Sequence, residues 1–451
     1  MTMEPRKSKK IKILMLPWLG HGHVTPFVEL AKKLSRRDLQ IYFCSTPVIL
    51  GSLKKKKKFS SDDDSIEFVE FHLPSSPELP PDRHTTNGLP SHLMPSLKKA
   101  FDMAGPSFSV ILETLKPDLI IQDYNQLPAT AVKYDIPTVR FISTGATVGA
   151  FFVHRIQKPD VEFPFPEIRL GEFHEKQFQD MIRPFTNGRA RDSSPVALKT
   201  TTLFNTFREL EGKGFDYLKE LSEKNVNYFA VGPLVRDAGD EEDDDRTTQT
   251  LQWLDKKENS STVFVSFGSE YFLSKDDMEE IAHGLDLSTA NFIWVVRFPA
   301  GQRVSVSEAL PEGFCERVGE RGLVMEDWAP QARILAHSST GGFVSHCGWN
   351  SILESLKFGA PMVAIPMHLD QPMNARLVEG AGVAVEVKRS GDGRLSREEI
   401  AEAIRKVVKE NDGEEIRVKA REFRDKIRVM GEEEVDMAVE EFVHLCINNK
   451  S

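Results

Sequence analysis

The sequence contains few cysteines, four in 451 residues, and no two of them form a CxxC pair. They are Cys44, Cys315, Cys347 and Cys446. This spacing indicates neither a disulfide framework nor a zinc site, and it fits a reducing compartment. Cys347 has no recognisable base beside it in the sequence, so we interpret it as a small packing residue.

Long apolar runs and excess positive charge are also absent. No stretch of about twenty apolar residues occurs, so we expect no membrane span. Residues 1–12 are basic, but the apolar run that follows is short and ends in a Gly/His turn, which is typical of a first strand rather than a signal peptide. The net charge of −10 argues against a nucleic-acid partner. The sequence predicts a monomer in the cytoplasm.

Two further motifs are missing. The first predicted strand is not followed by GxGxxG, which weakens a dinucleotide-binding interpretation. No DxD motif lies in a turn suited to a metal, because the acidic runs fall at residues 62–64 and 237–246, in segments without apolar residues. Solvated charge is the usual meaning of such runs. We therefore expect no metal and no cofactor.

The pattern that is present is an alternation of strands and helices. Residues 11–16 and 39–44 read as strands, and residues 24–36 between them have helical spacing of apolar residues. The alternation starts again with a strand at 262–267 and a helix at 275–285. Such alternation predicts parallel sheets, and the length is too great for one core. We predict an α/β fold of two doubly wound, Rossmann-like domains.

Composition shifts set the expected boundaries. We predict an N-terminal domain at 1–235, an acidic linker at 236–249, a C-terminal domain at 250–430 and a terminal helix at 431–451. A single helix is expected at 96–115, and the Ser396 and Glu399 pair predicts a capping box opening a helix at 397–409. Residues 73–92 and 151–200 lack periodicity, and we expect them to border a binding site.

The strongest binding signal lies in residues 328–371. A short buried strand at 340–345 leads through a turn into a helix at 352–358, which Asn350 or Ser351 can cap and Gly359 can end. A glycine-containing turn that opens a helix leaves backbone N–H groups at the positive end of its dipole, where phosphate binds.

Other side chains of this stretch complete a site for a nucleotide sugar. Glu354 lies one turn beyond Asn350 on the same helix face, where a carboxylate can accept hydrogen bonds from a ribose diol. Trp328 offers an aromatic face for a base. Asp370 and Gln371 follow the next strand, at the sheet edge where α/β folds bind ligands. The alternative is an ordinary βαβ unit with a packed tryptophan.

A second group of polar residues follows strands of the first half. The turn at 17–24 holds His21 and His23, and Asp123 comes directly after the strand at 118–122. A histidine near its usual pKa can act as a general base, and a carboxylate can hold it in one tautomer. The alternative for Asp123 is a helix N-cap.

Residues 328–371 closely resemble the C-terminal signature of plant family-1 UDP-glycosyltransferases, whose length they match without a gap. The resemblance extends over essentially the whole chain, through residues 17–26, Asp123, residues 266–269 and the Asp370–Gln371 pair. It implies the GT-B arrangement of two facing Rossmann-like domains, with the acceptor on the N-terminal one and the UDP-sugar on the C-terminal one. It also implies an inverting reaction without a metal.

The resemblance also implies individual roles. The base is His23, the second histidine of its turn, and Asp123 is its partner. The residues implied to bind the donor are Thr144, Ser269, Trp328, Ala329, Gln331, His346, Trp349, Asn350, Ser351, Glu354, Asp370 and Gln371. Trp328 stacks on uracil, and Gln331 and Glu354 hold ribose. Gln371, the last residue of the signature, indicates glucose as the donor sugar. The residues expected to contact the acceptor are Trp18, His21, Phe27 and His92.

Stretches such as PWLGHGH and HTTNGLPSHLMP resemble the branch that adds a sugar to an existing plant glycoside. We therefore predict a UDP-glucose-dependent glucosyltransferase that acts on a sugar hydroxyl of a triterpenoid or flavonoid glycoside, forming a β-1,6 or β-1,2 linkage. Three alternatives remain open. They are a glucosyltransferase acting on an aglycone, a non-catalytic nucleotide-sugar binder, which would need no His23–Asp123 pair, and an NAD oxidoreductase, which should carry GxGxxG.

Overall fold

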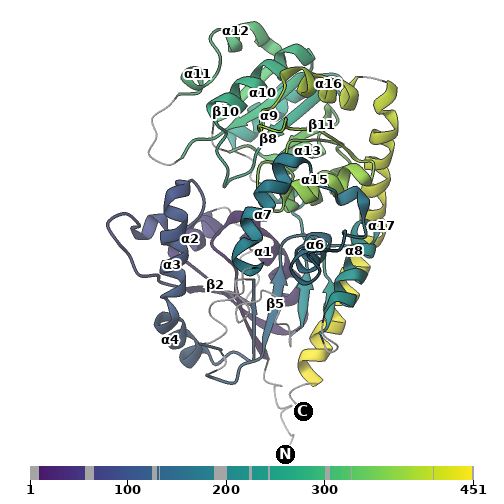
Figure 1. Cartoon of the computed structure of the whole chain (residues 1–451). Coiled ribbons are helices and arrows are strands. Elements are labelled where there is room, and N and C mark those ends of the chain that lie inside the picture. Colours follow the sequence, from purple (N-terminus) through teal and green to yellow (C-terminus); the bar gives the residue numbers. More distant parts are fainter. Residues whose placement is uncertain are drawn as a thin grey trace, which may run out of the picture.

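The chain folds into two lobes, one above the other in Figure 1, with a long C-terminal helix lying along both. A computed structural model describes residues 10–55, 65–123, 130–131, 133–186, 201–222, 226–241, 244–299, 305–326, 328–409 and 411–448. Two predicted features lie outside these residues: the acidic run at 62–64 and residues 187–200 of the irregular segment. No helix among the described residues is both long and apolar enough to cross a bilayer.

The N-terminal lobe is built on a seven-stranded sheet of order β3-β2-β1-β4-β5-β6-β7, in which all neighbours are parallel. Its strands are β1 (Ile11–Leu16), β2 (Leu39–Ser45), β3 (Ile66–Glu70), β4 (Leu119–Gln122), β5 (Thr138–Ile142), β6 (Thr202–Phe204) and β7 (Tyr228–Ala230). Its helices are α1 (His21–Ser35), α2 (Pro47–Lys55), α3 (Met94–Asp102), α4 (Gly105–Leu115), α6 (Ala146–Gln157), α7 (Glu172–Thr186) and α8 (Arg208–Leu221).

The C-terminal lobe repeats the plan with six parallel strands in the order β10-β9-β8-β11-β12-β13. The strands are β8 (Thr262–Ser266), β9 (Asn291–Val296), β10 (Gly322–Glu326), β11 (Thr340–Ser345), β12 (Met362–Ala364) and β13 (Ala384–Glu386). The helices are α9 (Asp245–Leu254), α10 (Lys275–Ser288), α11 (Val306–Ala309), α12 (Phe314–Val318), α13 (Gln331–Ala336), α14 (Trp349–Phe358), α15 (Gln371–Gly380) and α16 (Arg397–Val408). The predicted fold class, two parallel α/β domains, is confirmed.

Strand order explains where ligands can bind. In each sheet the connections reverse direction once, between β1 and β4 in the first lobe and between β8 and β11 in the second. Helices diverge from such a switch point and leave a crevice at the carboxyl ends of its strands. Register places Leu16 beside Gln122 and Ser266 beside Ser345, so the segments after these residues start side by side.

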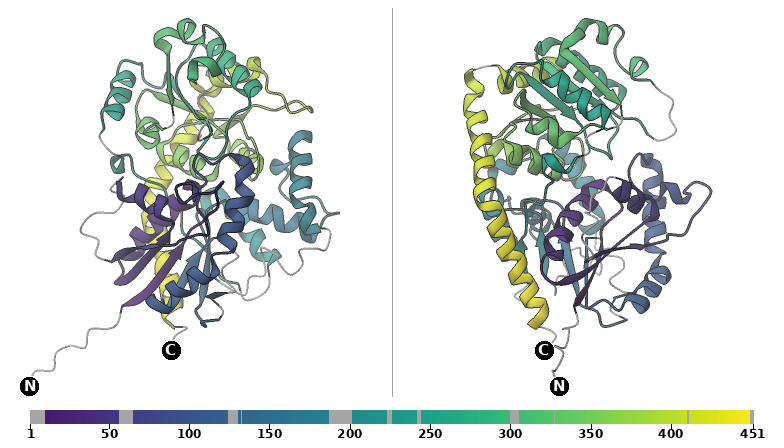
Figure 2. Two further views of the ribbon diagram at one scale, coloured as in Figure 1. Left: turned by 90° about the vertical axis from the view of Figure 1, so that its left-hand side faces the viewer. Right: turned by 180° about the vertical axis from the view of Figure 1, so that it is seen from behind.

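The last helix, α17 (Glu414–Asn448), ties the lobes together, and the view from behind in Figure 2 shows it running along one side of both. Its first half packs on α14. Farther along, Val435, Val439 and Phe442 are buried in the core of the N-terminal lobe. We expected the terminal helix to begin at 431, but α17 is one helix that begins at Glu414. Its apolar residues pack on a different lobe at each end.

Three other boundaries differ from the prediction. The helix expected at 96–115 is broken between α3 and α4, because Pro106 has no N–H to continue a helix and starts a new one instead. Helix α1 begins at His21, earlier than expected, so both histidines of the turn lie in its first turn. The acidic linker is partly structural, since Asp244 accepts a hydrogen bond from Thr247 N at 2.7 Å and caps α9.

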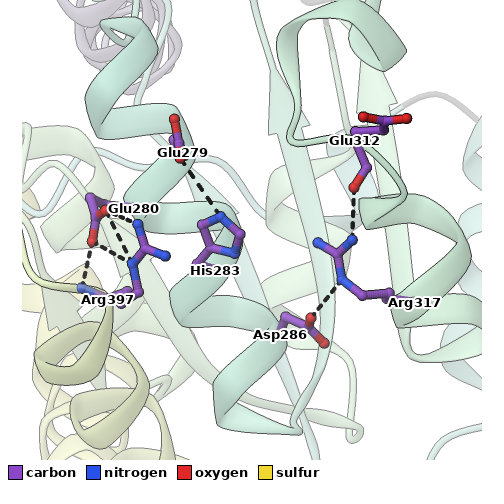
Figure 3. Close-up of polar contacts among 7 residues, drawn as sticks. All are labelled: Glu279, Glu280, His283, Asp286, Glu312, Arg317 and Arg397. Carbon is purple, nitrogen blue, oxygen red and sulfur yellow. Dashed lines mark hydrogen bonds and ion pairs between the residues drawn. The ribbon is translucent and has the colours of Figure 1, made fainter.

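The outer face of the C-terminal lobe carries ion pairs remote from the crevice (Figure 3). Glu280 on α10 accepts from the backbone N of Arg397 at 2.9 Å and from its guanidinium, which fastens the start of α16 to α10. Arg317 Nε donates to Asp286 at 3.2 Å. These side chains are half-exposed and do not line the central cavity, so they provide control positions for tests of the site.

Candidate active site

A cavity of about 610 Å³ lies between the two lobes. Its walls come from segments that follow β1 and β5 in one lobe and β8, β11 and β12 in the other. The cavity therefore lies at the carboxyl ends of both sheets, where the switch points lead us to expect it. Most of the predicted site residues line it, and four do not: Asp123, Trp18, Phe27 and His92.

His23 and Asp123 form a close pair on the N-terminal side. Nδ1 of His23 lies 2.6 Å from Oδ2 of Asp123, and Oδ1 of Asp123 accepts from the backbone N of Trp18 at 2.7 Å. Ser143 Oγ lies 3.1 Å from the same imidazole nitrogen. An ionised carboxylate only accepts, so Nδ1 carries the proton and Nε2 is left as the basic nitrogen. The imidazole is 37% exposed, while the carboxylate is 5% exposed.

Nearby carboxylates raise the pKa of His23. Burial opposes the protonated form, but the negative charges of Asp123, Glu270 and Asp370 and the hydrogen bond to Asp123 outweigh it. Asp123 therefore lies where a carboxylate can fix the tautomer and stabilise the imidazolium, as one does in a hydrolase triad. We considered Asp123 either as a partner of the histidine or as a helix N-cap, and the structure shows the contact with the histidine.

The pH dependence of transfer should report this pair. A general base must be unprotonated, so kcat/KM for the acceptor at saturating donor should rise with pH as His23 loses its proton. Because the pKa is raised, we expect the midpoint of this limb above the ordinary value of 6.5. Asp123→Asn removes a negative charge and should move the midpoint to lower pH as well as slowing transfer. A wild-type midpoint at or below 6.5, or one that Asp123→Asn leaves in place, would contradict this assignment.

The C-terminal side of the cavity is the N-terminal end of α14. We expected Asn350 or Ser351 to cap this helix, but the N-cap is Gly348, without a side-chain cap. Asn350 instead donates from Nδ2 to Gly22 O of the opposite lobe at 2.8 Å, and Ser351 lines the cavity. Gly359 ends the helix in the left-handed conformation at φ 72°, as predicted. An anion at this end would meet backbone N–H groups and the helix dipole.

His346 is wedged into the turn before α14. A Cβ at Gly268 or at Gly348 would lie 2.6 Å from its Nε2, so the ring fits only because both neighbours are glycines. Burial, with His368 nearby, lowers the pKa of His346 to about 3. The ring is therefore neutral at physiological pH and holds the turn without adding charge. Ser269, beside Gly268, also lines the cavity.

Farther along α14, the carboxylate of Glu354 meets the amide of Gln331 at the start of α13. Gln331 Nε2 donates to Glu354 Oε2. Burial raises the pKa of Glu354 to about 7, although the Gln331 hydrogen bond and the charge of Arg236 oppose the rise. Glu241 of the acidic linker accepts from Arg333 N at 3.1 Å and also lines the cavity, a neighbour that the linker prediction missed.

The predicted base platform borders this region. Trp328 is 39% exposed, and its ring centroid lies 5.9 Å from that of His21 on the other lobe. Ala329 is buried beside it, and both residues line the cavity. His21 therefore faces the region around Trp328, while His23 turns toward Asp123.

Several residues that we expected to contact the donor sugar make hydrogen bonds within the protein. Asp370 accepts from Thr144 Oγ1 at 3.0 Å, a contact between the lobes. Gln371 Oε1 accepts from the backbone N of Met367 at 3.0 Å. The indole of Trp349 donates to Asn205 O at 2.7 Å and is 3% exposed. Trp349 and Gln371 line the cavity, and these hydrogen bonds also hold its walls.

The predicted acceptor residues are mostly not at the cavity. Phe27 is fully buried against Phe141, with ring centroids 4.8 Å apart, so the expectation that it contacts the acceptor does not hold. Trp18 packs edge-on to Phe101 at 5.2 Å in the core, and His92 is exposed on a short 3-10 turn. Of the four, only His21 lines the cavity.

The sequence analysis named none of the apolar residues of the cavity wall, although it expected segment 151–200 to border a binding site. Helices α6 and α7 supply this wall with Val148, Phe152, Val153, Ile156 and Met181, and all but Val148 lie in that segment. The apolar spacing of residues 146–157, which overlaps the start of the segment, was the signal available for the individual residues. The N-terminus of α6 is closed by Glu211, which accepts from Ala146 N and Thr147 N at 2.8 Å.

Comparison with known proteins agrees with this geometry. The family described as UDP-glucoronosyl and UDP-glucosyl transferase matches residues 230–425, and the glycosyltransferase N-terminal domain matches residues 9–236. The chain is 53% identical to mogroside IIIx synthase of Siraitia grosvenorii, over 95% of this chain and 92% of that one. It is 47% identical to beta-D-glucosyl crocetin beta-1,6-glucosyltransferase of Gardenia jasminoides, over 94% and 97%.

A solved structure covers both lobes. Phytolacca americana UGT2, complexed with UDP-2fluoro-glucose and pterostilbene, is 26% identical and superposes with a TM-score of 0.76 over 97% of this chain and 99% of that one. Two facing Rossmann-like lobes with a cavity between their switch points define the GT-B class. The chain belongs to the UDP-glycosyltransferase family, and it is an enzyme of that family.

Proposed function

We propose that this enzyme is an inverting UDP-glucose-dependent glucosyltransferase that adds glucose to a sugar hydroxyl of a plant glycoside. The observation that carries the proposal is the opposition of two groups across one cavity. His23, with Asp123 behind it, lies on one side, and the uncapped N-terminus of α14 lies on the other. The hydrogen bond from Asn350 to Gly22 O joins the two sides at 2.8 Å.

This arrangement suits a direct displacement. Nε2 of His23 takes the proton of the acceptor hydroxyl while that oxygen forms a bond to the anomeric carbon. The bond from the anomeric carbon to the phosphate oxygen breaks, and UDP leaves with the electron pair. Attack from the face opposite UDP inverts the anomeric configuration. The backbone N–H groups of α14 stabilise the charge that grows on the diphosphate, and we propose that no metal takes part.

The same geometry supports the donor-binding roles that we propose. Trp328 supplies a flat face for uracil, and Glu354 with Gln331 accepts the ribose hydroxyls. Asp370 and Thr144 form a polar pair between the lobes, suited to hexose hydroxyls. Gln371 stands beside them, and glucose is the donor sugar that we propose.

The proposed acceptor class has two supports. Relatives at 53% and 47% identity are named for products or substrates that are glycosides. The cavity also combines an apolar wall, which suits a triterpenoid or flavonoid body, with carboxylates close to His23, which suit a sugar. A β-1,6 or β-1,2 linkage is expected. The apolar wall alone would equally suit an aglycone, which is the second candidate for the acceptor.

A paired panel of acceptors tests the proposal. Several monoglucosides of triterpenoids and flavonoids, each with its own aglycone, are incubated with UDP-glucose, and initial rates are compared. We expect kcat/KM to be higher for the monoglucoside in each productive pair, with a diglucoside as product. Faster turnover of the bare aglycones would reject the glycoside acceptor. No transfer to any acceptor, with UDP still bound, would favour a non-catalytic binder.

A further inference from the structure

Glu270 is a carboxylate of the cavity to which the mechanism above gives no contact with donor or acceptor. It lies in the loop between β8 and α10, on the C-terminal lobe, and it lines the central cavity. Its negative charge is among those that raise the pKa of His23, so it lies near the proposed base although it comes from the opposite lobe.

The N-terminal lobe leaves room for this carboxylate and holds it. Thr86 Oγ1 donates to Glu270 Oε1 at 2.8 Å. A Cβ at Gly20 would lie 2.2 Å from the same oxygen, so any side chain at residue 20 would displace the carboxylate. Thr86 is 1% exposed and belongs to the irregular segment 73–92, which the sequence predicted to border the acceptor. The carboxylate is thus held at a defined position at the start of α1, three residues from His23.

Of the carboxylates near His23, Glu270 is bonded to segment 73–92, which we expected to border a binding site. Both oxygens of Asp123 are engaged, by Trp18 N and by the imidazole. Asp370 lies at the start of α15, where its Oδ2 accepts from Thr144 and Asn374. Glu270 Oε1 is held by Thr86, and Oε2 has no hydrogen-bond partner among the residues that the structure describes.

We propose that Glu270 determines acceptor specificity by binding hydroxyls of the acceptor's sugar ring, which holds the attacking hydroxyl beside His23. This rests on the proposed glycoside acceptor. An ionised carboxylate accepts hydrogen bonds from neighbouring hydroxyls, and such charge-assisted bonds are stronger than neutral ones. Against an apolar aglycone the same carboxylate would lose water without gaining a partner, which is unfavourable. Glu270 therefore favours a sugar and disfavours a bare aglycone.

Binding measurements with UDP-saturated protein test this role without needing turnover. Titration calorimetry compares a flavonoid monoglucoside with its aglycone, for the wild type, Glu270→Ala and Glu270→Gln. We expect Glu270→Ala to weaken monoglucoside binding about 10- to 100-fold, the range for a hydrogen bond to a charged group. Glu270→Gln, which keeps shape without charge, should lose less. Aglycone binding should be unchanged or stronger, and UDP binding unchanged.

Two further variants sharpen the comparison. Thr86→Ala removes the anchor but keeps the carboxylate, so a smaller loss in the same direction is expected. Glu279→Ala removes an exposed carboxylate of the same lobe (Figure 3), and it should bind both acceptors like the wild type.

The outcomes separate this role from the proposed function. Equal weakening of monoglucoside, aglycone and UDP by Glu270→Ala would mean that Glu270 only holds the lobes together, and unchanged monoglucoside binding would remove it from the site. Either result overturns the inference. Failure of the wild type to transfer glucose to a monoglucoside that it binds would instead reject the proposed function.

Discussion

His23→Ala is expected to lower kcat for glucosyl transfer by at least about 100-fold, which is the low end of what a positioned general base supplies. The reason is that His23 lines the cavity and its imidazole is paired with a carboxylate, which prepares the other ring nitrogen to take a proton. UDP affinity should stay near normal, because the donor groups lie on the other lobe and Asn350 bonds to the backbone of Gly22, not to the imidazole.

Initial rates with UDP-glucose and a monoglucoside, together with UDP titration, check this result. His72→Ala is the matched control, because His72 is an exposed histidine of the same lobe that does not line the cavity. Transfer by His23→Ala above about one hundredth of the wild-type rate would show that another group takes the proton. Loss of UDP binding together with transfer would show instead that the substitution disrupts the cavity.

Glu354→Ala should weaken UDP binding about 10- to 100-fold, since it removes a charged acceptor of the ribose hydroxyls. The affinity of the wild type for UDP should also depend on pH. With its pKa raised to about 7, Glu354 is largely ionised at pH 8 and largely protonated at pH 6. The ionised form accepts from both hydroxyls, so wild-type affinity should fall as the pH drops through 7. Glu354→Gln should remove that dependence.

Calorimetric titration with UDP at pH 6 and pH 8 tests this expectation. Glu402→Ala is the control, because Glu402 is an exposed carboxylate on α16 that does not line the cavity. If Glu354→Ala binds UDP like the wild type at pH 8, Glu354 does not hold the ribose. If the wild type binds UDP equally well at both pH values, the ionisation of Glu354 does not control UDP affinity.

The sequence predicted the two α/β lobes and the meeting of the turn at 17–24 with Asp123 for one physical reason, while the family resemblance selected His23 over His21. Parallel strands put their carboxyl ends on one edge, so residues that follow β1 and β4 must meet whichever connection lies between them. The same rule brought Ser269 toward His346, after β8 and β11. Local caps were harder to predict. Asn350 is a good N-cap type, but the close packing of His346 requires glycine at 348, and Asn350 then reaches the other lobe.

The acceptor side was predicted less well. Phe27 lies on the apolar stripe of α1 together with Leu30 and Leu34, so its spacing already favoured the core over a ligand. The wall formed by α6 and α7 depends on how these helices pack between the lobes, and no local pattern encodes that contact. The position of Glu270 could not be predicted from local patterns either. Its neighbours Gly20 and Thr86 are remote in sequence and meet it only when the lobes face each other.

The central claim is that one displacement moves glucose from UDP, held at α14, to a sugar hydroxyl deprotonated by His23. Proton NMR of the product formed from UDP-glucose and a monoglucoside tests it most directly, because the spectrum gives both the anomeric configuration of the new bond and the site of attachment. We predict a β-linked glucose on the sugar of the acceptor. An α-linked product, or glucose attached to the aglycone, would contradict the account.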